Sequence, residues 1–205
     1  MSPGNFKIER SSLVGVKRFD EKAALTAALD VFWRQGLAGT SMPDLAEATG
    51  VQRGSLYNAY GDKEAVFLRA FDIYEKRFLQ LVEGSLVGTS AEAILLSFFH
   101  TVIENMFSGK PSRGCLTTKT AVDGSVASVR IQVRLQVLIE RLEMRLESAF
   151  RRPEVENQLH LAPNEAAELV VTFTRGLAVM ERITADKERL LRTSRALVAS
   201  LTKHA

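Results

Sequence analysis

Residues 40–64, TSMPDLAEATGVQRGSLYNAYGDKE, contain the boundaries of two short helices and the start of a longer one. Ser41 and Asp44 have the spacing of a capping box, and the proline between them stands in the first turn, where its missing N–H costs least. Gly50 breaks the first helix, and a second helix is expected over 51–60. The stretch therefore predicts two short helices joined by a tight turn.

Two short helices joined this closely must cross at a steep angle, which requires a small residue at the contact and a glycine at the corner. Ala46 and Gly50 are placed to supply them. The apolar residues spaced to fill a small core are Leu45, Val51 and Leu56. The side chains left on the outer face are Gln52, Arg53, Ser55, Tyr57 and Asn58. Side chains on such a face can reach the major groove of DNA.

Apolar residues recur at helical spacing along almost the whole chain, and no segment alternates apolar and polar residues with a period of two. We therefore predict an all-α fold of about nine helices. A first helix is expected over 21–35, before Gly36, and a long fourth helix over 62–84, while Thr89 should cap a fifth. The later helices are expected over 115–122, 125–150, 164–183 and 186–202.

These boundaries divide the chain into three regions. Residues 1–18 form a flexible basic arm, which either follows the minor groove of DNA or is a solvated tail. Residues 19–61 form a three-helix, helix-turn-helix DNA-binding domain. Residues 62–205 form a helical body for ligand sensing and dimerisation, which the long fourth helix joins to the first unit. The cations of the arm are Lys7, Arg10, Lys17 and Arg18.

Composition is that of an ordinary globular protein, with 46% hydrophobic and 25% charged residues in a chain of 205. No apolar run approaches the roughly 20 residues that span a bilayer, and residues 1–12 lack the apolar core of a signal peptide. The one cysteine has no intrachain partner, so a cytoplasmic location and no membrane contact are expected. A formal net charge of +3 permits binding to a polyanion, but many enzymes share it.

The stretch at 40–51, followed by GSLYNAYGDKE at 54–64, resembles the DNA-binding region of TetR-family transcriptional regulators. The first helix also resembles the family at its start, Phe19-Asp20, and at its end, FWRQG over 32–36. The resemblance covers about the first third of the chain, and the remainder is similar only in helical layout. It implies a homodimeric repressor that binds a double-stranded, near-palindromic operator and releases it on a small-molecule or electrophile/oxidant signal.

The resemblance also implies roles for individual residues. Arg53 resembles the base-reading position, because arginine can bridge O6 and N7 of guanine, and the alternative is a phosphate contact. Tyr60 stands where phenylalanine is more usual, so its ring should pack while its hydroxyl faces the DNA backbone. The full set of candidate DNA contacts is Thr40, Gln52, Arg53, Ser55, Tyr57, Asn58, Tyr60 and Lys63.

The body contains candidates for an effector pocket, which are Phe98, Phe99, Met106, Thr117, Thr118 and Phe173. Aromatic and methionine side chains at helical spacing are equally typical of a hydrophobic core. His100 has no second histidine or cysteine at ligand spacing, so we expect no metal site, and no motif indicates a cofactor.

Cys115 should begin a short helix after a loop rich in helix breakers, with Arg113 and Lys119 nearby in sequence. A helix N-terminus and neighbouring cations both favour the thiolate. The sequence Gly-Cys-Leu also resembles a pattern found in several TetR-family branches, including some whose cysteine senses electrophiles or oxidants. Cys115 is thus a redox-sensor candidate, and the alternative is a small thiol buried between helices.

The last two helices carry apolar stripes, and the family resemblance implies that they form a four-helix interface between two protomers. An enzyme would need a recognisable triad, metal site or phosphate loop, and the sequence has none, so we expect no enzymatic activity. A DNA-binding architectural factor, gated by a protein partner rather than by a ligand, is the alternative function.

Overall fold

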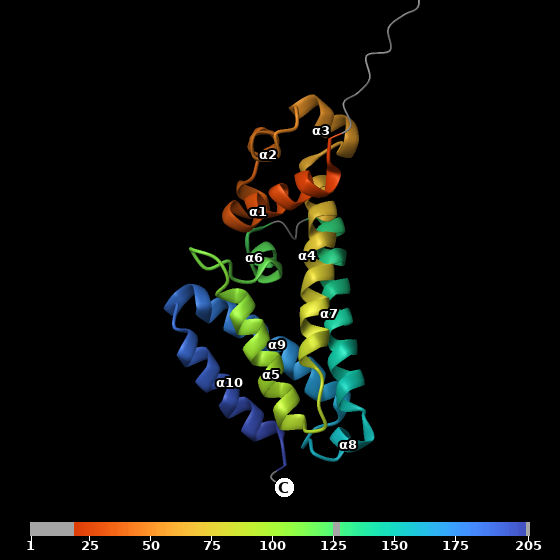
Figure 1. Cartoon of the computed structure of the whole chain (residues 1–205), viewed down its shortest axis with the longest axis vertical. Helices are drawn as coiled ribbons and strands as arrows, with labels where there is room; N and C mark the ends of the chain where they lie inside the picture. Colours follow the sequence, from red (N-terminus) through yellow and green to blue (C-terminus); the bar gives the residue numbers. More distant parts are fainter. Residues whose placement is uncertain (1–18, 125–127, 204–205) are drawn as a thin grey trace, which may run out of the picture.

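The structure of the protein is a computed structural model that describes residues 19–124 and 128–203 (Figure 1). These residues form ten helices, with no β-strand beyond an isolated bridge between Leu159 and Thr202. The helices are α1 (Glu21–Gly39), α2 (Met42–Thr49), α3 (Arg53–Tyr60), α4 (Lys63–Ser85), α5 (Ala91–Met106), α6 (Leu116–Val122), α7 (Val129–Phe150), α8 (Pro153–Glu156), α9 (Pro163–Thr184) and α10 (Lys187–Leu201). The predicted all-α fold is confirmed. The basic arm predicted over 1–18 lies outside the described residues.

Helices α1–α3, here called the N-terminal unit, form one end of an elongated molecule (Figure 1). Helix α4 leaves this unit and runs beside α7 (Figure 1). In the body, α9 packs on α7 and α10 packs on α5, while α6 contacts α1, α7 and α9. Helices α4 and α6 therefore both connect the N-terminal unit to the body. None of the helices in the described ranges is long and apolar enough to cross a membrane.

Several helix boundaries in the first half of the chain differ from the sequence prediction, and α3 starts at Arg53 rather than at residue 51. Gly36 interrupts α1 as expected, with φ 78° in the region that glycine enters without steric cost, but one more turn follows it, to Gly39. The cap of α5 was predicted wrongly by one residue. Ser90, and not Thr89, accepts the hydrogen bond from the main-chain N–H of Ala93, so the helix starts at the residue after Ser90.

Two further differences lie in the second half. Helix α7 starts at Val129, later than the predicted residue 125, because the Ser128 hydroxyl caps it. The single turn α8 was not predicted, since four residues are too few to show a helical period.

A column of aromatic rings runs from the N-terminal unit along α4 into the body. Phe32 of α1 meets Phe67 edge to face with ring centroids 5.2 Å apart. The column continues through Phe71, Tyr74 and Phe78, each 5.3–5.7 Å from the ring before it. All five side chains belong to one buried cluster that includes residues of both the N-terminal unit and the body. The two parts therefore share a continuous hydrophobic core.

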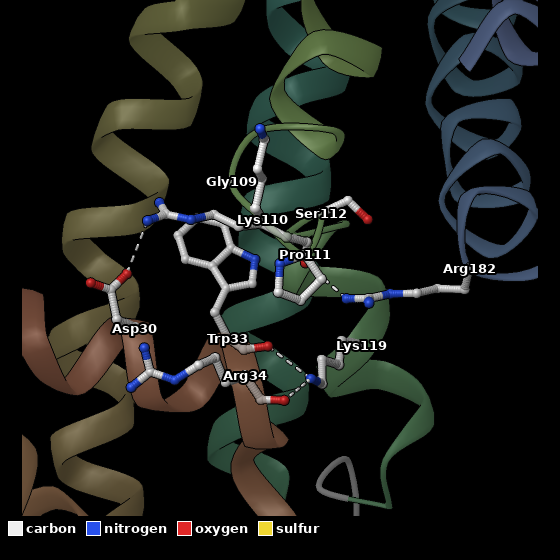
Figure 2. A pocket seen from close by; sticks show the side chains of 10 residues that line it. Asp30, Trp33, Arg34, Gly109, Lys110, Pro111, Ser112, Lys119 and Arg182 are labelled. Atoms are coloured by element: carbon white, nitrogen blue, oxygen red, sulfur yellow. Dashed lines mark hydrogen bonds and ion pairs between the residues drawn. The ribbon is translucent and has the colours of Figure 1, made fainter. Parts of the chain in front are cut away.

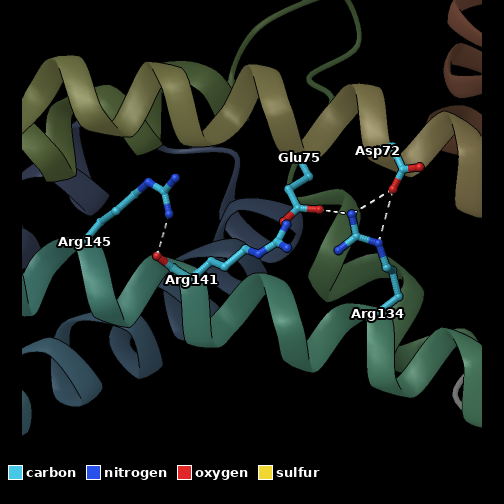
Figure 3. A network of polar contacts seen from close by, with 5 residues as sticks. All are labelled: Asp72, Glu75, Arg134, Arg141 and Arg145. Carbon is cyan, nitrogen blue, oxygen red and sulfur yellow. Dashed lines mark hydrogen bonds and ion pairs between the residues drawn. The ribbon is translucent and has the colours of Figure 1, made fainter.

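Helix α4 is clamped to α7 by a buried carboxylate (Figure 3). Glu75, only 2% exposed, forms ion pairs with Arg134 and, at 2.7 Å, with Arg141. Arg134 also reaches Asp72 one turn away on α4, at 2.8 Å. A buried carboxylate is tolerated only when charged partners and hydrogen bonds compensate its lost hydration. We call Glu75, Arg134 and Arg141 the α4–α7 clamp.

Helix α6 is attached to α1 by hydrogen bonds to main-chain atoms near the Gly36 kink. Lys119 Nζ donates to the carbonyl oxygens of Trp33 and Arg34, each at 2.8 Å. Because Gly36 departs from helical geometry, the regular hydrogen-bond ladder of α1 is disturbed here. Lys119 thus supplies a charged donor to carbonyl groups beside the kink.

Asp123, at the end of α6, bonds to the other side of the same kink. Its Oδ2 atom accepts hydrogen bonds from the main-chain N–H of Leu37 at 3.0 Å and of Ala38 at 3.3 Å. The approach is close, because a Cβ atom at Gly36 would lie 3.0 Å from that oxygen. Lys119 and Asp123, with the main-chain groups they bind, are called the α1–α6 junction.

Candidate DNA-binding face and thiol site

The start of α2 is fixed by a reciprocal capping box. Asp44 accepts hydrogen bonds from the main-chain N–H of Ser41 at 2.8 Å and from its hydroxyl at 2.7 Å, while Asp44 N–H donates to Ser41 Oγ at 3.3 Å. The hydroxyl and N–H of Ser41 lower the pKa of the Asp44 carboxyl below its ordinary value. Helix α2 ends at Gly50, whose φ of 65° makes the tight turn predicted from the sequence.

The turn sets α3 so that one face packs and the other meets solvent. Leu45 and Leu56 are buried, whereas Gln52 and Asn58 are exposed. Arg53 is the first residue of α3, and its side chain is exposed. The predicted outer face therefore exists as a surface in the described structure.

Arg53 and Tyr57 lie together on this face. The Arg53 guanidinium carbon is 5.4 Å from the centroid of the Tyr57 ring, and Nη2 is 3.5 Å from the Tyr57 hydroxyl. Arginine stacked on an aromatic ring loses fewer rotamers when it binds a partner. The pair presents a cation and a phenol hydroxyl side by side, which suits neighbouring base and phosphate groups.

Lys63 and Tyr60 stand beside α3 with partners inside the protein. Lys63 Nζ donates to the Ala38 carbonyl at 3.5 Å and is half-buried. The Tyr60 ring lies 6.4 Å from the Phe19 ring, and its hydroxyl donates to Glu21 at 3.4 Å. Burial and then the negative charge of Glu21 raise the pKa of Tyr60. The expected packing of the ring is seen, but its hydroxyl is directed to Glu21.

Thr40, the DNA-contact candidate at the entry to α2, has its hydroxyl directed into the protein. Its side chain is 2% exposed, and its hydroxyl donates to the Gly36 carbonyl at 2.6 Å. Sequence reasoning placed it at the start of α2, where a hydroxyl can face phosphate, but here it caps the end of α1. Ser55, by contrast, is half-buried on α3, and it stays a candidate.

Cys115 is the N-cap residue of α6, as the sequence predicted, and its side chain is 8% exposed. The cation beside it is Arg175 of α9, whose Nη1 is 3.5 Å from the sulfur. The sequence neighbours named above face elsewhere, since Lys119 binds α1 and Arg113 pairs with Asp30. The contact with Arg175 could not be predicted from the sequence, because the two residues lie 60 positions apart along the chain.

Arg175 shapes the acidity of the thiol. Burial raises the pKa of Cys115, but the Arg175 guanidinium and hydrogen bonds from the start of α6 lower it by more, so the net pKa is below the ordinary value. Tyr74 lies in the same cluster and shares a hydrogen bond of 3.4 Å with Thr117. Burial and the neighbouring Cys115 charge raise the pKa of Tyr74, which keeps it protonated. The thiol thus sits beside a cation and a neutral phenol.

The side chains proposed for an effector pocket lie in the hydrophobic core or in α6. Phe98, Phe99 and Met106 are at most 2% exposed and pack in the hydrophobic core. Phe173 is partly buried against Phe99, with ring centroids 5.6 Å apart. Thr117 is buried and Thr118 half-buried in α6. The aromatic and methionine side chains of this stripe pack as a hydrophobic core does, and none of the candidates lines the cavity beside Trp33.

His100 is exposed on α5 and pairs with Glu104 at 3.5 Å, one turn away. Within the described ranges, no group of three or more histidine, cysteine and acidic side chains is arranged to hold a metal ion.

The apolar stripes of the last two helices are largely used inside the protomer. Val170, Leu177 and Leu190 are all buried. The large apolar side chains that α9 leaves exposed are Leu169, Val179 and Ile183, at 40%, 45% and 70%. An interface with a second copy would therefore use these outward residues.

Comparison with known proteins places these features in a family. A sequence profile described as "Bacterial regulatory proteins, tetR family" matches residues 24–70. The HTH-type transcriptional repressor ComR of Escherichia coli is 31% identical over 183 residues, which cover 85% of each chain. The repressor DhaR of a Mycobacterium species is 22% identical over 164 residues, or 78% of this chain and 81% of DhaR.

Solved structures agree with this relationship. A cysteine variant of the TetR-family regulator CifR, complexed with 26 bp operator DNA, matches with a TM-score of 0.80 at 26% identity, over 90% of this chain and 98% of CifR. The reduced form of NemR from E. coli shares the fold, with a TM-score of 0.79 at 17% identity over 90% and 97% of the two chains. These named relatives are regulators and not enzymes. With its ComR likeness over most of both chains, this protein belongs to the TetR family of bacterial regulatory proteins.

Proposed function

We propose that this TetR-family DNA-binding regulator is a dimeric repressor whose operator binding is switched off when Cys115 reacts with a small electrophile or oxidant. The observation that carries the proposal is the Arg175 guanidinium 3.5 Å from the buried sulfur. As a regulator of the chromosome it acts in the cytoplasm, where thiols are kept reduced. Its relative CifR was solved on operator DNA as a variant with three cysteines replaced.

DNA binding is assigned to the outer face of α3. Arg53 reads a base, and Tyr57 and Lys63 bind phosphates, with Gln52, Ser55 and Asn58 available to adjust the contact. Two copies are needed because a recognition helix of 8 residues reads too few bases alone. The exposed apolar residues of α9 form part of the dimer interface.

Replacing Arg53 and Lys63 separates base reading from phosphate binding. Arg53→Ala should weaken operator binding at least about fivefold and relax preference at one position of each half-site, since a bidentate guanine contact contributes about 1–3 kcal/mol. Lys63→Ala should weaken all sequences alike and reduce the salt dependence. Fluorescence anisotropy with operator and random duplexes measures both. Equal losses on the two duplexes for Arg53→Ala would contradict the base-reading role.

The chemistry at Cys115 needs only the thiolate and a reagent. With an activated alkene, the sulfur forms an S–C bond, the alkene electron pair moves to the neighbouring carbon, and that carbon takes a proton from water. The product is a neutral thioether, so Arg175 loses the negative partner that the thiolate provided. Added atoms in a site that is 8% exposed must also displace the start of α6.

Movement of α6 reaches the N-terminal unit through the α1–α6 junction. Lys119 and Asp123 are four and eight positions beyond Cys115 on the same short helix and bond directly to α1 main-chain groups. A ligand or modification changes operator affinity only if it favours one spacing of the two recognition helices over another. The junction offers a direct route for that preference.

Alkylation by iodoacetamide tests the switch at a known atom, since Cys115 is the only cysteine. Because the pKa of the thiol is lowered, its reaction rate should rise with pH through a midpoint below about 8.5, the ordinary thiol value. Arg175→Gln should move that midpoint upward, because the guanidinium no longer favours the thiolate, whereas the exposed control Arg195→Gln should not. Alkylation should release operator DNA from the wild type but not from Cys115→Ser. Release from both proteins would refute the proposal.

A further inference from the structure

A cavity in the described part of the chain lies where the N-terminal unit meets the body (Figure 2). It has a volume of about 380 Å³, within the range of small-ligand sites. Its walls come from α1, from the loop between α5 and α6, from α6 itself and from Arg182 of α9. Neither Cys115 nor any of the core aromatic residues considered above lines it.

Positive charge dominates the cavity lining. Its cationic side chains are Arg34, Lys110, Arg113, Lys119 and Arg182, against the single carboxylate of Asp30. Arg113 already pairs with Asp30 at 3.3 Å, whereas Arg34 and Lys110 take part in no ion pair within the described residues. A concave surface lined by charge of one sign focuses its field on the cavity. The ligand that this field attracts is an anion.

Crowding of these cations is visible at Lys119. Burial and then the positive charge of Arg182 lower the pKa of Lys119, even though Asp123 acts in the opposite sense. Like charges held close together store repulsion that a bound anion relieves. The cavity therefore has a reason to bind negative charge that is independent of its shape.

Trp33 gives the cavity a flat apolar wall. The Arg113 guanidinium carbon lies 5.0 Å from the centroid of its ring, and the ring is nearly perpendicular to that of Tyr74, with centroids 5.3 Å apart. Its indole nitrogen is buried and has no hydrogen-bond partner within the described residues. Figure 2 shows that nitrogen on the side of Pro111, which also lines the cavity. A buried N–H donor without an acceptor is costly, and a ligand oxygen can satisfy it.

We propose that this cavity is a second regulatory site, which binds a small organic anion consisting of a carboxylate on an aromatic ring. The carboxylate is held by Arg113, together with Arg34 and Lys110. The ring lies against Trp33. Because the walls belong to both α1 and the body, occupancy is coupled to operator binding. This coupling rests on the DNA-binding function, but binding of the anion itself does not.

Intrinsic fluorescence reports on the site directly, because Trp33 is the only tryptophan in the chain. The probe is benzoate, the neutral isostere benzamide is the control, and inorganic phosphate tests for an anion without a ring. All titrations use full-length Cys115→Ser, so the outcome does not depend on thiol chemistry. Benzoate should change the emission saturably, with a dissociation constant on the order of 1 mM or lower for a ligand of this size. Benzamide and phosphate should each bind at least tenfold more weakly.

Matched arginine variants locate the binding. Arg113→Gln should weaken benzoate at least tenfold, and Arg34→Gln, which leaves the pair of Asp30 intact, should weaken it by a smaller factor. Arg151→Gln, on the far end of α7, should leave benzoate affinity unchanged. Absence of saturation, or equal binding of benzoate and benzamide, overturns the site. Equal binding of phosphate overturns the aromatic specificity.

Operator titrations test the coupling. In the same Cys115→Ser protein, saturating benzoate should change operator affinity several-fold, and benzamide should not. By reciprocity, operator DNA should change benzoate affinity by the same factor. Benzoate binding without any change in operator affinity would leave a binding site and overturn its regulatory role. Neither result bears on the reaction of Cys115 in the wild type.

Discussion

Between α4 and α7 the contact is a buried carboxylate gripped by two arginines, whereas between α1 and α6 it is a lysine and an aspartate bonded to main-chain groups beside a kink. Breaking the first leaves charges without partners in a dry site, which is expensive. Breaking the second exposes partly solvated groups that water can satisfy. The α4–α7 clamp is therefore suited to hold the protein together, and the α1–α6 junction to be released by a signal.

The largest expected effect is at the clamp. Glu75→Ala removes the partner of Arg134 and Arg141 and should cost about 3 kcal/mol, the lower end for a broken buried pair because both arginines reach solvent. Urea denaturation measures this cost. Asp72→Asn, which removes only the exposed ion pair of Arg134, should cost less than about 1 kcal/mol. Similar losses of unfolding free energy in Glu75→Ala and Asp72→Asn would contradict the special role of the buried carboxylate.

The α1–α6 junction should give a smaller change in stability and a larger change in signalling. Lys119→Met keeps the aliphatic stem but removes both bonds to α1, at a cost of about 1 kcal/mol for a half-exposed charged donor. Release of operator DNA after alkylation of Cys115 should be reduced severalfold. Lys76→Met, on the exposed side of α4, is the matched control. Undiminished release in Lys119→Met would show that the signal takes another route.

The smallest effect is expected at the capping box of α2, which takes part in neither the α4–α7 clamp nor the α1–α6 junction. The folded pKa of Asp44 is depressed by Ser41, so its stabilising contribution is complete above the unfolded pKa and is lost as pH falls through the folded value. Asp44→Asn should lower the melting temperature slightly at neutral pH, and the difference should vanish in acid. Parallel curves for the two proteins down to about pH 3 would argue against this role of the cap.

Sequence alone predicted the N-terminal unit well, because its signals are local. The cap formed by Ser41 and Asp44, the turn at Gly50 and the polar outer face of α3 each depend on residues within a few positions of one another. The bond of the Thr40 hydroxyl to the Gly36 carbonyl was not predicted, because it depends on a kink and not on periodicity. The DNA contacts themselves stay predictions.

Contacts between distant segments could not be predicted in the same way. Arg175 reaches Cys115, and Arg141 reaches Glu75, across 60 and 66 residues, and no spacing rule connects them. The aromatic stripe around Phe98 was equally compatible with a pocket and with a core until the packing of the helices decided for the core. The cavity beside Trp33 is assembled from separate segments, so no single stretch of sequence encodes it.

The aromatic column along α4 has a consequence for engineering regulators of new specificity. Phe32 of the N-terminal unit packs on Phe67, which lies beyond the predicted domain boundary at residue 61. A chimaera cut at that boundary would pair Phe32 with a foreign residue, whereas one that carries the first turns of α4 keeps the contact. Because the rings join both parts in one core, the intact chain should melt in a single cooperative transition. A chimaera that takes its operator specificity from this protein should therefore include the aromatic column together with the N-terminal unit.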